Sequence, residues 1–85
     1  MSFTPTTITM ADAGQALREG LASIAQGETL IDLSGLASFD SSAVSAVLAW
    51  KRAGSALGRP LQIAGVPKGL LSLAQLYGLQ DLMHS

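Results

Sequence analysis

The residues best suited to chemistry lie together at Asp40-Ser41-Ser42, where a carboxylate is followed by two hydroxyl groups. A nucleophilic serine needs a general base, most often a histidine that a carboxylate orients. The sequence contains one histidine, His84, and no cysteine. We expect the C-terminal end to be frayed, so His84 is a poor candidate for a rigidly held base. We therefore expect no enzymatic activity, and a hydrolase that uses Ser41 is kept only as a control hypothesis.

Sites for cofactors and metals are not indicated either. The glycines around Pro67 lack the spacing and the Lys-Ser/Thr pair of a phosphate-binding loop. Scattered acids and a single histidine give no cluster of metal ligands. The five basic residues are spread along the chain and the net charge is −1, whereas nucleic-acid-binding surfaces are concentrated and basic. We expect no cofactor, no metal and no nucleic-acid partner.

The composition predicts one domain over residues 1–85 with a thin core. Hydrophobic residues make up 48% of the sequence and aromatic residues only 5%, so small aliphatic side chains must fill that core. Charged residues amount to 13%, and such a weakly charged surface is typical of a protein that a partner covers. The N-terminus does not look like an export signal, and apolar runs stay below the roughly 18 residues of a membrane span. We expect a cytoplasmic protein that does not insert into membranes.

Strand-like and helix-like patterns alternate along the sequence. We expect strands over residues 6–10, 29–33 and 61–64, helices over residues 12–26, 41–57 and about 67–77, and a helical turn over residues 79–83. Residues 34–39 are expected to be a connection. This β-α-β-α-β-α order with a short helical tail predicts an α/β domain, in which a small, mostly parallel β-sheet packs against helices.

Particular side chains sharpen this expectation. Ile8 and Met10 should share one face of the first strand, and Gly14 and Gly20 should mark close packing of the first helix. Asp32 interrupts an apolar strand, so it must reach hydrogen-bond donors or the end of the sheet.

The long helix leaves the role of Trp50 open. If Val44, Val47 and Leu48 face the sheet, Ala46 and Trp50 lie toward the outer edge. Trp50 is then either a core residue on a second apolar line or an aromatic anchor for a partner.

The junction at Asp40 should lie at the carboxyl end of a strand, where α/β domains usually meet ligands or partners. Asp40 is expected to cap the following helix by accepting a hydrogen bond from the amide of Ser42 or Ala43. Ser41 would then be exposed at the start of the helix. These positions suit contact with another protein.

Two segments around the junction resemble a known family. Ile31-Asp32-Leu33-Ser34 and Phe39-Asp40-Ser41-Ser42-Ala43-Val44 resemble the core motif of STAS domains. The segments 48–53 and 67–79 are similar to the MlaB branch, the cytoplasmic STAS subunit of a bacterial phospholipid-transport ABC complex. The resemblance covers about residues 6–83. It implies a STAS-like fold without catalysis, bound to an MlaF-like ATPase subunit and thus peripheral at the inner membrane, in a system that maintains outer-membrane lipid asymmetry.

The same resemblance leaves a second function open. In phosphorylated STAS domains the modified residue directly follows the Asp of the motif. In this sequence that residue is Ser41. The alternative is therefore an anti-sigma factor antagonist whose Ser41 is phosphorylated by a partner kinase. The chain departs from longer members by lacking a second N-terminal strand, and Ala43 stands where many sigma-pathway members have Gly. For either partner, the expected contact residues are Ser38, Phe39, Asp40, Ser41, Ser42, Ser45 and Trp50.

Overall fold

A computed structural model describes residues 3–83, apart from the side chain of Leu82. Its elements are β1 (Thr7–Ile8), α1 (Ala13–Ala25), β2 (Leu30–Asp32), β3 (Ser38–Phe39), α2 (Ser41–Ala56), β4 (Gln62–Ala64), α3 (Lys68–Leu76) and the 3-10 helix η1 (Gln80–Met83). The predicted α/β class, the three helices and the helical tail are confirmed. One strand was not predicted, because β3 forms inside the expected connection.

The strands form two parallel pairs, β1 with β3 and β2 with β4. The stretch 30–39 supplies one strand to each pair, so it crosses between them as it approaches α2. In the first pair Thr7 lies opposite Ser38, and the amide of Asp40 donates to the carbonyl of Ile8 at 3.3 Å. Because parallel partners point the same way, the ends of β1 and β3 meet at one edge. The turn after β1 therefore lies beside the start of α2.

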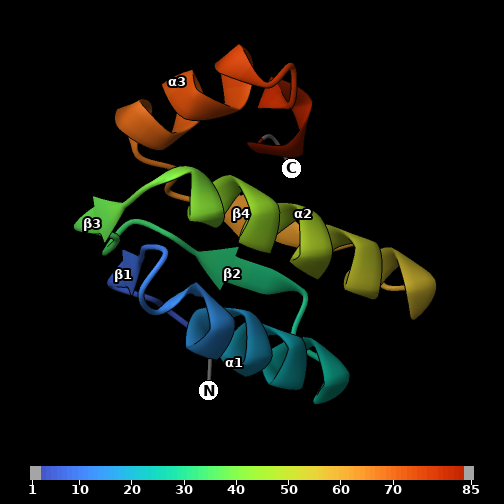
Figure 1. Ribbon diagram of the computed structural model, residues 1–85. Helices are drawn as coiled ribbons and strands as arrows, with labels where there is room; N and C mark the ends of the chain where they lie inside the picture. Colours follow the sequence, from blue (N-terminus) through green and yellow to red (C-terminus); the bar gives the residue numbers. More distant parts are fainter. Residues whose placement is uncertain (1–2, 84–85) are drawn as a thin grey trace.

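Helix α2 is the central element of the domain. It packs against α1 on one side and against α3 and η1 on the other (Figure 1). Its sequence from Ser41 to Ala56 contains no Pro and is rich in Ala, and Gly58 and Pro60 follow its end. An outward face of α2 remains between its two neighbouring helices.

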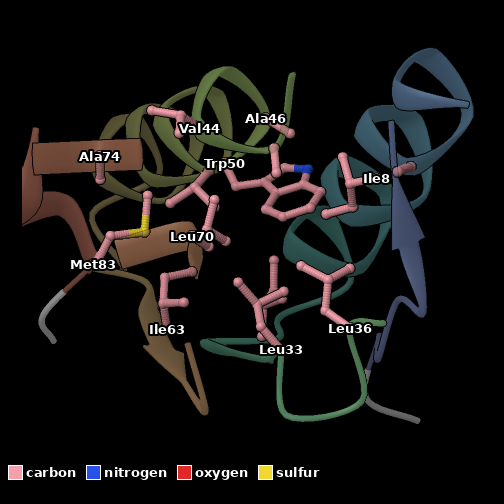
Figure 2. Close-up of a cluster of buried hydrophobic side chains, with 14 of the residues drawn as sticks. Ile8, Leu33, Leu36, Val44, Ala46, Trp50, Ile63, Leu70, Ala74 and Met83 are labelled. Carbon is pink, nitrogen blue, oxygen red and sulfur yellow. The ribbon is translucent and has the colours of Figure 1, made fainter. Parts of the chain in front are cut away.

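The buried core gathers around Trp50, whose ring is fully buried (Figure 2). Its Nε1 donates a hydrogen bond to the carbonyl oxygen of Leu17 in α1 at 3.2 Å. A Cβ on Gly20 would overlap the indole ring, so this glycine makes the space that the ring occupies. Phe3 adds an edge-to-face contact at 5.5 Å between ring centroids. The close packing predicted for Gly20 is thus confirmed.

The second role considered for Trp50, an exposed anchor for a partner, is wrong because the side chain is fully buried. Ala46, also expected at the outer edge, is buried too. The reason is that α2 packs against α1 on one side and against α3 and η1 on the other, which buries a wider arc of the helix than one apolar line. The polar Nε1 of the ring is compatible with this burial because the Leu17 carbonyl accepts its hydrogen.

Two expectations for the N-terminal segment also fail. Met10 is 80% exposed and does not share the buried position of Ile8. The strand ends at Ile8, and the carbonyl of Thr9 accepts hydrogen bonds from the amides of Asp12 and Ala13 in a tight turn. A Cβ on Gly14 would meet only the Arg18 side chain, at 3.5 Å, so this glycine does not mark close packing.

Candidate functional site

Asp40 holds the junction between β3 and α2. Its Oδ1 accepts a hydrogen bond from the amide of Ser42 at 2.8 Å, which confirms the predicted helix cap. Its Oδ2 accepts from the amide of Met10 at 2.9 Å. The amides of Met10 and Ser42 stabilise the ionised carboxylate and lower the pKa of Asp40. One side chain therefore fastens the start of α2 to the turn after β1.

Asp12 tightens that same turn instead of capping its own helix. Its carboxylate accepts from the amide of Thr9 at 2.6 Å and from the hydroxyls of Thr7 and Thr9. The Thr7 hydroxyl and the Thr9 amide lower the pKa of Asp12. The negative charge of Asp12 acts in the opposite direction on Asp40, whose pKa it raises slightly against the larger effect of the amides. The turn is thus held by two carboxylates from different parts of the chain.

A hollow of about 570 Å³ opens beside the junction. Its walls are Met10, Ser41, Ser42, Val44, Ser45, Leu48, Tyr77 and Leu79. Ser41 and Ser42 are half-buried and Ser45 is exposed, so their side chains form part of its accessible surface. Tyr77 and Leu79 follow the end of α3 and close the opposite wall. The structure therefore brings three of the predicted contact residues together with three that sequence reasoning missed: Met10, Tyr77 and Leu79.

The other predicted contact residues lie elsewhere. Ser38 is exposed on β3, and Phe39 is half-buried. The ring of Phe39 lies against the start of α3, since a Cβ on Gly69 would come within 3.0 Å of its Cζ. Neither residue lines the hollow at the junction, and Trp50 belongs to the core. Ser41, Ser42 and Ser45, with Asp40 behind them, remain as the candidate site.

The hollow continues along α2. A second, shallow hollow of about 580 Å³ is lined by residues of α2 alone: Leu48, Lys51, Arg52, Ser55 and Ala56. The two hollows share Leu48. We call these two hollows together the α2 groove. On the other side of α2, a smaller hollow of about 230 Å³ lies between Ser42, Ser45 and Ala46 and the first turns of α1. Among the described residues that line these three hollows, none is acidic.

The described lining of the α2 groove has few groups that could take part in catalysis. The described lining of the α2 groove contains no histidine, cysteine or carboxylate that could act as a base for Ser41. His84 lies outside the described residues. Within residues 3–83, no group of His, Cys, Asp and Glu is arranged to hold a metal ion. Of the helices described, none combines the length and apolarity needed to cross a membrane.

Comparison with known proteins identifies the family. No curated protein and no solved structure gave a significant match to the chain. A family model described as "Mlab, STAS domain" matches residues 6–84, which is nearly the whole chain. The match includes the junction, α2 and all residues that line the α2 groove. The chain therefore belongs to the MlaB-like STAS domain family.

Proposed function

We propose that this chain is a non-catalytic cytosolic subunit that binds and steadies the ATPase of a Mla-type phospholipid ABC transporter. STAS domains are generally protein-interaction domains, and the family model is the MlaB-like one. Through its partner the chain would lie at the inner membrane and support outer-membrane lipid asymmetry. The observation that carries the proposal is the α2 groove, which opens directly beside Ser41, Ser42 and Ser45.

The groove has the chemistry of a protein interface. Met10 is 80% exposed and Tyr77 is 57% exposed, although both are large apolar or aromatic side chains. Methionine and tyrosine are enriched where proteins meet, and an exposed apolar patch commonly marks such a contact. Both residues line the hollow together with serines, Val44 and Leu48 of α2. A partner would remove this apolar surface from water without any change in the core.

The alternative, an anti-sigma factor antagonist, draws on the position of Ser41. This serine is the first residue of α2, is half-buried and lines the groove. A phosphate there would add a charge of about −1.5 to −2 next to Asp40. At a closed interface this charge would be buried without a counter-charge, which disfavours binding. Ser41→Glu should then release the partner, and unchanged affinity of that variant would count against the alternative.

Co-purification of the tagged chain from its native cells tests both functions. An ABC ATPase supports the transporter subunit, and an anti-sigma kinase supports the alternative. Ser45→Trp should abolish recovery of the partner, since it fills the edge of the groove. Ser72→Trp is the matched control, because Ser72 is also an exposed helical serine but lies outside the groove. Recovery of neither class of partner would reject the proposed function.

A further inference from the structure

We propose that Met10 is an oxidation site, where a peroxide converts the thioether to a sulfoxide. The product makes one wall of the hollow beside Ser41 polar and so disfavours an apolar contact there. Oxidation at this position is a property of the chain alone and goes beyond the proposed function. Only its effect on the binding of a partner rests on that function.

The two described methionines differ in their access to solvent. The side chain of Met10 is 80% exposed, whereas that of Met83 is 4% exposed and packs in the core (Figure 2). An oxidant must touch the sulfur atom, so the rate of sulfoxide formation follows exposure. Within residues 3–83, Met10 is therefore the methionine that an oxidant in solution reaches without any opening of the fold.

Backbone hydrogen bonds, and not the thioether, hold Met10 in its turn. The Met10 amide donates to Oδ2 of Asp40 at 2.9 Å. The carbonyl of Thr9 accepts from the amides of Asp12 and Ala13 on the other side of the turn. The side chain of Met10 does not belong to the hydrophobic core cluster. Oxidation of the sulfur should therefore change the surface and leave the fold intact.

The position of Met10 gives its oxidation a consequence. Met10 lines the hollow of about 570 Å³ together with the apolar side chains of Val44 and Leu48 and the hydroxyl groups of Ser41 and Ser42. A thioether sulfur is a weak hydrogen-bond acceptor, whereas a sulfoxide is polar. Serine hydroxyls can donate to its oxygen, so the product suits the polar part of the lining. The apolar part of the hollow becomes smaller as a result.

The reaction with hydrogen peroxide uses no protein group other than the sulfur atom. An S–O bond forms as the O–O bond of the peroxide breaks, and hydroxide leaves. The hydroxide takes the proton of the transferred OH group and becomes water. The sulfur loses two electrons and the peroxide gains two. Methionine sulfoxide reductase with a dithiol reverses the change, since the sulfoxide oxygen leaves as water and the dithiol becomes a disulfide.

Oxidation of the purified full chain by hydrogen peroxide tests the site. Trypsin places Met10 and Met83 in different peptides, and fragmentation in the mass spectrometer separates Met10 from Met1. In the folded chain Met10 should oxidise at least about tenfold faster than Met83, and urea should remove this difference. Equal rates in the folded chain or faster oxidation of Met83 would overturn the inference, as would a difference that persists in urea.

Urea unfolding of the oxidised chain tests whether the change is confined to the surface. The midpoint of unfolding should be the same before and after oxidation of Met10. Met10→Leu is the matched control, because it keeps an apolar side chain and reports any effect of peroxide at Met1. A lower midpoint for the oxidised natural chain, with Met83 still reduced and Met10→Leu unaffected, would overturn the inference.

Binding of the co-purified ATPase gives a further readout, which rests on the proposed function. After removal of the peroxide, the oxidised chain should bind about tenfold more weakly, since the contact would bury a polar group. The reductase should restore the affinity, and the affinity of Met10→Leu should not respond to peroxide. Equal affinities of the oxidised and reduced natural chain would overturn the inference. If no ATPase is recovered, the proposed function fails, while the oxidation rates at Met10 and Met83 still decide the inference.

Discussion

Gly20→Ala should destabilise the domain because the indole ring of Trp50 fills the space beside α1. The new Cβ would lie 2.9 Å from Cδ1 of Trp50 and closer still to Nε1 and Cε2, so the ring must move. Overpacking costs about 1–3 kcal/mol, and the lost hydrogen bond to Leu17 adds about 1 kcal/mol. Alanine regains about 1 kcal/mol in helix propensity. The free energy of unfolding should therefore fall by about 1–3 kcal/mol.

Urea unfolding followed by circular dichroism measures this effect, and a double-mutant cycle isolates its cause. In a Trp50→Leu background the ring is absent, so Gly20→Ala should be neutral or stabilising, with a coupling energy of about 2–3 kcal/mol. Gly14→Ala is the control in the same helix. Its Cβ meets only the Arg18 side chain, so it should stabilise by up to about 1 kcal/mol. Additive effects of Gly20→Ala and Trp50→Leu would refute the packing argument.

Trp50 should emit at blue-shifted wavelengths in the free protein, because its ring is fully buried, and a solvent-like spectrum would contradict that burial. Acid should destabilise the domain through Asp40. Its folded pKa lies below the ordinary value of 3.8, so its contribution is present above pH about 4 and is lost as the pH falls through the folded pKa. Urea unfolding across that range should show a shallower decline for Asp40→Asn than for the natural chain. Gly65→Ala should destabilise by more than Gly78→Ala. Both glycines have positive φ, but only at Gly65 would a Cβ also lie within 2.8 Å of Asp32 Oδ1, and equal unfolding midpoints would reject this difference.

The regular parts of the fold could be predicted because their patterns are local. The helix at 41–56 was recognisable from its length without Pro, its cap at Asp40 and its stop at Gly58. Asp32 was expected to find donors, and its Oδ1 accepts from the amide of Ser34 at 2.9 Å. Strand β3 was missed because two residues are too short to show an alternation, and its pairing with β1 depends on residues 31 positions earlier. Such a strand is specified by its neighbour, not by its own pattern.

Only those residues of the candidate site that are close to Asp40 in the sequence could be predicted. Ser41, Ser42 and Ser45 follow Asp40 directly, so the sequence placed them together. Met10, Tyr77 and Leu79 were missed because their positions depend on contacts that are not local. The Met10 amide donates to a carboxylate 30 residues away, and Tyr77 and Leu79 follow α3, which packs against α2. One feature of the sequence could have indicated the position of Met10. A parallel partner for the strand before Asp40 would bring the turn after the first strand to the same edge.

The burial of Trp50 shows how this domain divides its side chains between core and surface. The only tryptophan is used inside, where Gly20 and the Leu17 carbonyl hold it, so α2 is fixed rigidly on its inner face. Apart from Lys51 and Arg52, the outer face carries mainly serines and alanines with Leu48, and such small side chains allow another backbone to come close. Under the proposed function, the larger contact side chains would therefore come from the partner. Removing a serine hydroxyl would change such a contact little, and for this reason the test of the groove adds bulk at Ser45.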